Sequence, residues 1–199
     1  MKNTLKTRFD KAYWEDKYSI EATGWDIGYA SDPLAEYFKQ LTNKELKILI
    51  PGGGNCYEAE YLFEQGFKNV FVIDIAEQPL KNLKTRFPNF PDNHLIHDDF
   101  FNHIRKYDLI VEQTFFCALD PVLRHKYVDK MQDLLTENGK LAGLLFDFEL
   151  TEAGPPFGGS STEYSQLFSE KFTIKKLERC YNSIKPRDGR ELFFIFEKK

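Results

Sequence analysis

Short apolar segments alternate along the chain with longer segments in which apolar residues recur every three or four positions. The short segments have the length of buried strands and predict strands at 46–50, 70–74, 94–97, 107–112 and 141–146. The longer segments predict helices at 5–18, 32–41, 56–65, 77–87 and 121–135, the last of which is closed by Asn138 and Gly139. Strands that alternate with helices indicate βαβ units, and therefore a parallel sheet with helices on both faces.

The pattern changes after residue 150. A loop rich in Gly and Pro, 152–161, leads into a short helix whose start carries a capping box, Ser160 with Glu163. The strand-like segments 172–181 and 191–197 follow with little helical pattern between them, so we expect an antiparallel hairpin. The sequence therefore predicts an α/β fold with a seven-stranded, mostly parallel sheet that ends in this hairpin.

Length, composition and charge narrow the class of protein. The 199 residues have the length of one domain, 1–199, and a hydrophobic content of 42% excludes a disordered chain. The formal net charge of −4 argues against binding to nucleic acid or to an anionic membrane surface. We expect a small-molecule substrate, no nucleic-acid or membrane partner, and a monomer.

The cysteines and the N-terminus favour a cytoplasmic protein. Cys56, Cys117 and Cys180 are too far apart in the sequence to form a CxxC motif, and we expect buried, reduced thiols. The N-terminal residues carry charges throughout and include no apolar segment of the kind found in a secretion signal.

The strongest local signal for a binding site is the run Pro51-Gly52-Gly53-Gly54, which joins a buried strand to the start of a helix. Glycines let the backbone approach a ligand, and the amides of a helix start bind a carboxylate or phosphate. Asp74 ends the next strand, where an acid can accept hydrogen bonds from both ribose hydroxyls. Together these features predict a cofactor that carries adenosine, either NAD or S-adenosylmethionine.

The residues after the glycines favour S-adenosylmethionine. A dinucleotide fingerprint that starts at Gly52 requires glycine where this chain has Tyr57. Glu58, on the first turn of the predicted helix, would repel a pyrophosphate but tolerate an ammonium group. The predicted C-terminal hairpin also favours the sheet of a class I methyltransferase over a plain nucleotide-binding sheet.

Further motifs resemble the thiopurine S-methyltransferase family, and especially its branch of halide and thiol methyltransferases. The resemblance extends from Trp14 to the C-terminus and rests on Trp14, 24–28 (GWDIG), Pro33, 50–54 (IPGGG), 72–75 (VIDI), 99–101 (DFF), 107–112 (YDLIVE), 114–119 (TFFCAL), Arg124 and 154–157 (GPPF). It implies a Rossmann-like class I methyltransferase that uses S-adenosyl-L-methionine and releases S-adenosyl-L-homocysteine. The implied acceptor is a small, soft nucleophile: a thiol, a thiopurine-like thiol, hydrosulfide, thiocyanate or a halide.

The resemblance also implies roles for individual residues. The implied cofactor-binding residues are Trp14, Tyr18 and Trp25 in an N-terminal lid (1–30), Gly52 and Gly54 at the methionine part, Asp74 at the ribose, Asp99 and Phe100 at the adenine, and Gln113 at the methyl-transfer site. The implied substrate-site residues are Glu112, Phe116, Phe157 and Arg124, the last as a cation near the substrate opening.

Two positions depart from the family pattern. Cys56 stands where the glycine loop commonly continues with another glycine, which makes the turn less permissive. Tyr18 stands where the halide branch often has tryptophan, so the choice of acceptor within the family stays open.

Plainer interpretations and other functions compete with these assignments. Arg124 could pair with a nearby carboxylate, and we expect Cys117 to be a small buried hydrophobe. The His and Asp residues of 94–103 match no metal-ligand spacing, so we expect no metal. We identify no general base, and a thiol with a pKa near 8.5 does not require one. The alternatives are a catalytically silent cofactor-binding protein and, disfavoured by Tyr57 and the hairpin, a nicotinamide-dependent reductase.

Overall fold

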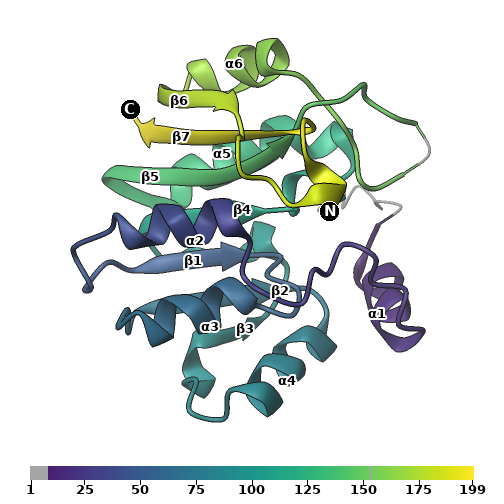
Figure 1. Ribbon diagram of the computed structural model, residues 1–199, viewed down its shortest axis with the longest axis vertical. Helices are drawn as coiled ribbons and strands as arrows, with labels where there is room; N and C mark the ends of the chain where they lie inside the picture. The colour runs from purple at the N-terminus through teal and green to yellow at the C-terminus, as the bar shows by residue number, and fades with distance from the viewer. Residues whose placement is uncertain (1–8, 153) are drawn as a thin grey trace, which may run out of the picture.

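The computed structural model describes residues 9–152 and 154–199, and within them the chain forms a seven-stranded sheet (Figure 1). The strands are β1 (Ile48–Pro51), β2 (Val70–Asp74), β3 (Leu95–His97), β4 (Tyr107–Gln113), β5 (Leu135–Phe146), β6 (Phe172–Arg179) and β7 (Glu191–Lys198). Their order is β3-β2-β1-β4-β5-β7-β6. Strands β1 to β5 pair in parallel, and β7 lies antiparallel between β5 and β6. The predicted parallel sheet and terminal hairpin are confirmed.

Helices cover both faces of this sheet, because alternate residues of each buried strand face opposite sides. The helices are α1 (Lys11–Ser19), α2 (Asp32–Lys39), α3 (Tyr57–Glu64), α4 (Glu77–Arg86), α5 (Arg124–Leu134) and α6 (Ser161–Ser169). Leu49 packs in one core cluster with Met131 of α5, while its neighbour Ile50 packs in the other with Leu62 of α3. The sheet is therefore buried on both faces, as a parallel sheet requires.

Helix α1 is shorter than predicted and stands apart from the core. It begins at Lys11 rather than at residue 5, because Asp10 caps it by accepting a hydrogen bond from the Tyr13 amide at 3.1 Å. Residues 5–8 of the prediction lie outside the described residues. None of the residues of α1 is buried. Figure 1 shows α1 beyond the end of the sheet to which the β1 arrow points.

Strand β5 corrects the predicted boundary between helix and strand. The strand begins at Leu135 rather than at residue 141, directly after α5. Asn138 and Gly139 lie in an irregularity of its pairing with β4, where Tyr107 opposes Leu135 and Leu109 opposes Lys140. Asn138 has φ of +60°, a left-handed conformation that Asn tolerates well. These residues therefore form a bulge within the strand and do not close the helix.

The hairpin side of the sheet matches the sequence prediction more closely. The amide of Glu163 donates to Oγ of Ser160 at 3.2 Å, which forms one half of the predicted capping box, whereas the side chain of Glu163 pairs with Arg124. Strand β6 forms one edge of the sheet and carries a register shift between Ile174 and Lys176. The three-residue strand β3 forms the other edge. Across the described residues, each helix is too short or too polar to cross a membrane.

Candidate functional site

A cavity of about 1400 Å³ opens at the carboxyl ends of the parallel strands. Three parts of the chain that are distant in sequence meet around it: α1, the loop 147–160 and the turn between β6 and β7. Figure 1 shows all three on the same side of the sheet. The carboxyl edge of a doubly wound sheet is the usual place for ligands, so this cavity is the candidate site.

The glycine loop forms part of the cavity wall. Gly52 and Gly54 have φ of +56° and +53°, conformations that side chains rarely adopt. A Cβ on Gly52 would overlap the ring of Phe115, so only glycine fits there. Gly52 lines the cavity, and the amide of Gly54 donates to Asp74.

Cys56 has the backbone of a glycine without being one. Its φ is +62°, and its Sγ lies 2.8 Å from the carbonyl oxygen of Gly54, to which it donates. The side chain is buried beneath the loop, and burial raises the pKa of the thiol well above its usual value. Cys56 thus keeps the left-handed backbone that a glycine would adopt at the start of α3, and it does so as a strained residue.

Asp74 projects from the end of β2 into the cavity, where the sequence analysis placed it. Its Oδ1 accepts from the amide of Ala76 at 2.8 Å and its Oδ2 from the amide of Gly54 at 3.2 Å. Only 7% of the residue is exposed, and burial raises the pKa of the carboxyl to about 6. Each oxygen keeps acceptor capacity for a ligand hydroxyl.

The segment after β3 supplies another wall. Asp99 accepts from the amide of Phe101 at 2.9 Å and so caps the 3-10 turn η2 (Phe100–Asn102). The ring of Phe100 is buried and meets the ring of Phe115 edge to face, with centroids 5.2 Å apart. Asp99 and Phe100 both line the cavity, as the resemblance implied.

Three aromatic residues of the N-terminal segment cover the glycine loop. The ring of Trp25 meets those of Trp14 and Tyr18 edge to face, at centroid distances of 5.5 and 5.8 Å. The hydroxyl of Tyr18 lies directly over Gly54, 3.3 Å from where a Cβ would stand. All three aromatic residues line the cavity. The structure therefore brings the predicted lid residues together above the predicted cofactor loop.

Polar contacts join this segment to the starts of α3 and α4 and to the loop before α3. Glu15 accepts from the amide of Glu77, at the start of α4, at 3.0 Å. The side-chain amide of Asn55 donates to Asp26. Glu58 accepts from the amide of Ser31 at 3.0 Å and is buried there. Glu58 therefore faces the N-terminal segment and does not line the cavity.

Several predicted site residues at the other end of the cavity lie behind its wall. Phe116 and Phe157 are buried, with exposures of 1% and 4%, and neither lines the cavity. Glu112 is completely buried, and its oxygens accept hydrogen bonds from protein groups. Gln113 ends β4, and among the described residues its buried Oε1 has no hydrogen-bond partner. Thr114, Phe115 and Cys117 line the cavity instead.

Arg124 requires a correction. Its guanidinium forms an ion pair with Glu163 and donates to the carbonyl oxygen of Gly158 at 2.6 Å. The side chain lies against the ring of Phe116 and is only 6% exposed. The prediction of an available cation at the substrate opening is wrong, because α6 brings a carboxylate onto Arg124 and its charge joins α5 to α6.

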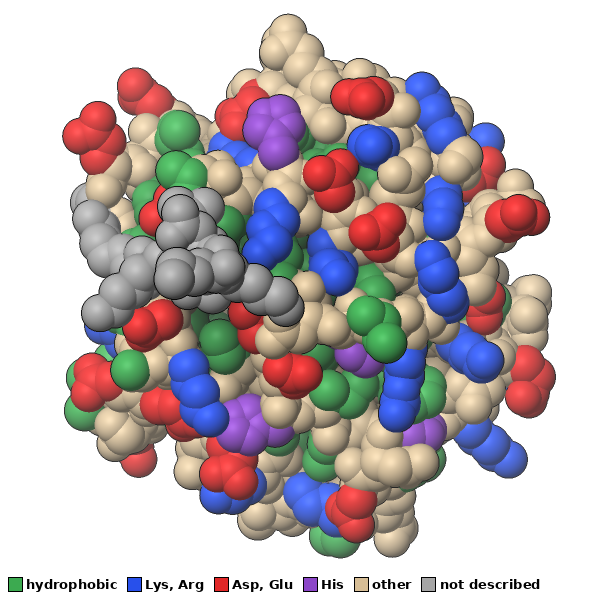
Figure 2. Space-filling view, turned by 180° about the vertical axis from the view of Figure 1, so that it is seen from behind, with side chains coloured by type: hydrophobic (Ala, Val, Ile, Leu, Met, Phe, Trp, Pro, Cys, Tyr) green, Lys and Arg blue, Asp and Glu red, His purple; other side chains and the backbone are tan. Residues whose placement is uncertain are grey.

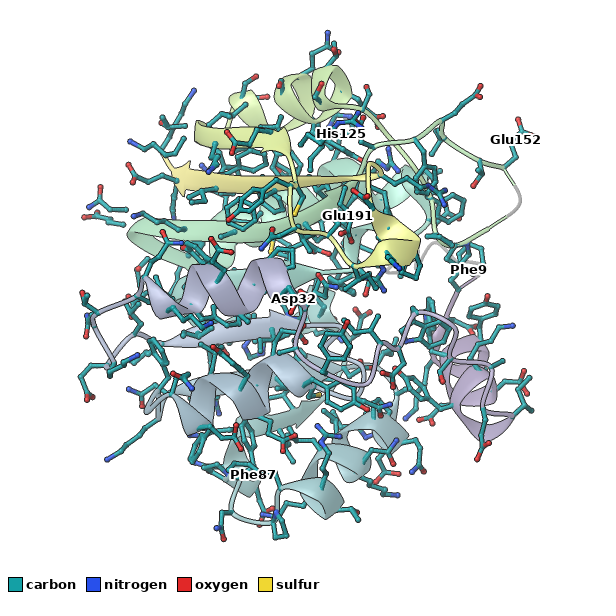
Figure 3. The ribbon with its side chains drawn as sticks, viewed as in Figure 1. Phe9, Asp32, Phe87, His125, Glu152 and Glu191 are labelled. Atoms are coloured by element: carbon teal, nitrogen blue, oxygen red, sulfur yellow. The ribbon has the colours of Figure 1, made fainter. Side chains whose placement is uncertain are left out.

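Two arginines that the sequence analysis did not select line the cavity from the turn between β6 and β7. Arg187 is 9% exposed, donates to the carbonyl oxygen of Trp25 at 2.7 Å and lies 3.5 Å from Glu191. Its Nη1 has no hydrogen-bond partner among the described residues. Arg190 lies over the ring of Phe148, with its guanidinium carbon 4.5 Å from the centroid. In Figure 3 the labelled Glu191 marks this turn beside β7.

The loop 147–160 closes the same end. Phe148, Pro155 and Pro156 line the cavity, and the amide of Phe157 donates to the carbonyl oxygen of Cys117 at 2.8 Å. The ring of Phe9 meets the ring of Phe157 at 5.6 Å. Figure 3 shows Phe9 between α1 and the loop that carries Glu152. The N-terminal segment therefore reaches both ends of the cavity.

His94 and His103 have packing roles. His94 lies 3.0 Å from the carbonyl oxygen of Val70, and Nε2 of His103 lies 2.7 Å from the hydroxyl of Tyr107. Over residues 9–152 and 154–199, no group of three or more His, Cys, Asp and Glu side chains is placed to hold a metal ion.

Comparisons with known proteins agree with this geometry. A family model described as Thiopurine S-methyltransferase (TPMT) matches residues 9–198. The chain is 28% identical over 159 residues to probable thiol methyltransferase 2 of Arabidopsis thaliana, which covers 77% of this chain and 70% of that protein. It is 27% identical over 196 residues to thiocyanate methyltransferase 1 of Brassica oleracea, covering 94% and 85%.

The fold has a close counterpart among solved structures. The crystal structure of 1,6-didemethyltoxoflavin-N1-methyltransferase of Burkholderia thailandensis, with bound 1,6-didemethyltoxoflavin and S-adenosylhomocysteine, superposes with a TM-score of 0.77. The sequences are 16% identical, and the match covers 95% of this chain and 87% of that chain, which shows the shared fold. With the family match across nearly the whole sequence, these findings establish that the chain belongs to the thiopurine S-methyltransferase family and is an S-adenosylmethionine-dependent methyltransferase.

Proposed function

We propose that the protein transfers a methyl group to a small, soft, anionic nucleophile: a thiolate, a thiopurine-like thiolate, hydrosulfide, thiocyanate or a halide. The observation that carries the proposal is the acceptor end of the cavity, where aromatic and proline side chains surround two arginines, Arg187 and Arg190. The names of the thiol and thiocyanate methyltransferases among the relatives support the same class of acceptor.

The residues of the other end fit the cofactor. Asp74 holds a buried carboxylate with acceptor capacity left for ribose hydroxyls, and Gly52 lines the cavity without a side chain, where a Cβ would overlap the ring of Phe115. Asp99 and Phe100 would bound the adenine, and Trp14, Tyr18 and Trp25 would cover the cofactor from the N-terminal segment. When bound, S-adenosylmethionine supplies a methyl group that is already activated for displacement.

The protein then has to align the acceptor with the methyl group, exclude water and balance the charge of the acceptor. The walls formed by Phe115, Phe146 and Phe148 exclude water and favour polarizable, weakly hydrated acceptors. Arg187 lies close to Trp25, and Glu191 at 3.5 Å offsets part of its charge; together with Arg190, Arg187 attracts an anion to the end of the cavity. A thiol with a pKa near 8.5 is partly ionised at neutral pH, so no general base is required.

The surface charge supports a small-molecule acceptor over nucleic acid. On the face shown in Figure 2, basic side chains are interspersed with acidic ones. A protein that binds the phosphate backbone gathers its Lys and Arg in one stripe or patch. The family match also leaves the nicotinamide-dependent reductase without support.

Turnover with a panel of acceptors tests the proposal. Thiophenol, hydrosulfide, thiocyanate, iodide and a thiopurine would be incubated with S-adenosylmethionine, and the methylated products measured by gas or liquid chromatography. We expect methylation of at least one of these acceptors, with amines and alcohols unreactive. Methylation of an amine alone would refute the acceptor class, and binding of S-adenosylhomocysteine without any turnover would favour the silent alternative.

A further inference from the structure

Glu112 is the most deeply buried acid beside the cavity, and it faces away from it. The residue is 0% exposed and is the last but one of β4. Its Oε1 accepts from the amides of Phe115 and Phe116, at 2.7 and 2.9 Å, and its Oε2 accepts from the hydroxyl of Tyr127. Among the described residues, the hydrogen bonds of this carboxylate are therefore with the loop after β4 and with α5, and it does not line the cavity.

The loop that Glu112 holds contains a strained residue. Thr114 has φ of +57°, a left-handed conformation in which a β-branched side chain is a genuine outlier. Such a residue persists only where its surroundings fix it, and Glu112 binds the next two amides of the chain. The carboxylate thus supplies the contacts that keep Thr114 in this conformation.

The strained turn determines where Phe115 lies. The ring of Phe115 occupies the space that a Cβ on Gly52 would need, and it meets the ring of Phe100 edge to face at 5.2 Å. Thr114 and Cys117, on either side, line the cavity towards its acceptor end. One loop therefore touches the glycine loop, the adenine wall and the acceptor wall.

We propose that Glu112 is a positioning residue for methyl transfer, which holds the loop 114–117 so that Phe115 supports the cofactor loop while Thr114 and Cys117 bound the acceptor. The role depends on the acceptor oxygens of the side chain and not on its negative charge. This inference rests on the proposed function where it is tested by turnover. The same loop also contacts the glycine loop, so cofactor binding tests it independently of turnover.

A matched pair of substitutions separates a role of the acceptor oxygens of Glu112 from a role of its negative charge. Glu112→Gln keeps an oxygen for both loop amides and can donate to the Tyr127 oxygen, but it removes the charge. Glu112→Met has a similar size and fills the same space, but it leaves both amides without an acceptor. We expect Glu112→Gln to keep kcat and the KM for cofactor within about threefold of wild type, and Glu112→Met to lower kcat/KM by about 10–100-fold.

A second substitution tests the link to the strained turn. Thr114→Gly removes most of the cost of the left-handed conformation, so in the Glu112→Met background it should recover part of the lost activity, by about threefold or more. The control is Asp108→Ala at the opposite end of β4, where Asp108 accepts from the amide of Lys47 at 2.9 Å. Corrected for the folded fraction, this control should keep wild-type kinetics.

The outcomes are distinct. Loss of activity in Glu112→Gln equal to that in Glu112→Met would show that the charge itself is needed, and would overturn the proposal even if the Met variant does not fold. Equal effects of Glu112→Met and Asp108→Ala, or no recovery with Thr114→Gly, would reduce Glu112 to a stability role. Binding of S-adenosylhomocysteine, measured by calorimetry on the same variants, still reports on the loop if the wild-type chain methylates none of the acceptors tested.

Discussion

The two ends of the cavity are built in different ways. At the proposed cofactor end, the walls beneath the N-terminal aromatic residues come from turns that directly follow parallel strands: the glycine loop after β1, Asp74 at the end of β2 and Phe100 after β3. At the acceptor end, Phe148 follows β5, Arg187 lies in the hairpin turn and Phe9 precedes α1. The first end is local in sequence, whereas the second assembles segments from the whole chain.

The two ends also differ in charge. Asp74, Asp98 and Asp99 line the proposed cofactor end, where Lys126 also lies over the ring of Phe101, and Arg187 and Arg190 line the acceptor end. The cofactor brings a sulfonium and ribose hydroxyls, which suit carboxylates, while an anionic acceptor suits guanidinium groups. If both assignments hold, the charges of the walls place the two ligands at opposite ends of one cavity, and substitutions at each end test this arrangement.

The largest effect is expected from removing the acid of the cofactor end. Asp74→Ala removes the acceptor for the proposed ribose hydroxyls and leaves the amides of Gly54 and Ala76 unpaired. Binding of S-adenosylhomocysteine should weaken by about 1–3 kcal/mol, measured by calorimetry. Asp92→Ala, which removes an exposed acid paired with Lys84, is the control. Wild-type affinity in Asp74→Ala would remove the ribose assignment.

A change at the acceptor end should act on the other ligand. Arg187→Gln should raise the KM for thiocyanate by about tenfold, equivalent to about 1.4 kcal/mol, and raise the KM for a neutral thiol less. Arg124→Gln should lower the melting temperature without this selectivity, because Arg124 is paired with Glu163. Steady-state kinetics and thermal unfolding of both variants distinguish the two arginines, and an equal change in both KM values would leave Arg187 without a role in anion binding.

The pH dependence of cofactor binding reports on Asp74. Burial raises the pKa of this carboxyl to about 6, so the ionised acceptor is present above pH 6 and is lost as the pH falls through that value. Affinity for S-adenosylhomocysteine should therefore fall by about tenfold between pH 7 and pH 5. The dependence should flatten in Asp74→Asn, which does not titrate. A wild-type affinity that is constant over this range would contradict the role of the ionised carboxylate.

The smallest effect is expected in the N-terminal segment that joins the two ends. Gly24 and Gly28 flank the Trp25 loop, and Trp25 and Asp26 bind Arg187 and Asn55. We predict that this segment is a lid ordered by ligand, so its amides should exchange a few-fold more slowly with cofactor present. Hydrogen exchange followed by mass spectrometry measures this, and equal protection in both states would make Trp14 and Trp25 plain packing residues.

The contrast between the two ends also explains what the sequence could predict. Gly52 and Asp74 follow short buried strands, and their positions depend only on the local change from strand to helix. Arg187 depends on the antiparallel pairing of β6 with β7, which no local pattern places beside Trp25. The turn of the predicted C-terminal hairpin was the available signal, since a hairpin turn must lie where its two strands end.

Of two misplaced residues, Arg124 shows the same limit and Glu112 does not. Arg124 is neutralised by Glu163, which is 39 residues away and reaches it only when α6 packs on α5. The orientation of Glu112, in contrast, follows from alternation along β4, because Ile110 and Glu112 share the face that meets α5. This alternation of side chains along the strand can be read from the sequence, and it indicates an acid that faces the core.

The register shift in β6 has a consequence for the protein in concentrated solution. An edge strand presents unpaired backbone groups on which another molecule can add a strand, and such pairing is a route to aggregation. Beside the shift, Lys175 pairs with Glu197 at 3.1 Å and Lys176 with Glu178 at 2.9 Å, so charges stand along this edge. The opposite edge, β3, offers only three residues. Both edges of the sheet therefore discourage the intermolecular strand pairing that its apolar centre would otherwise invite.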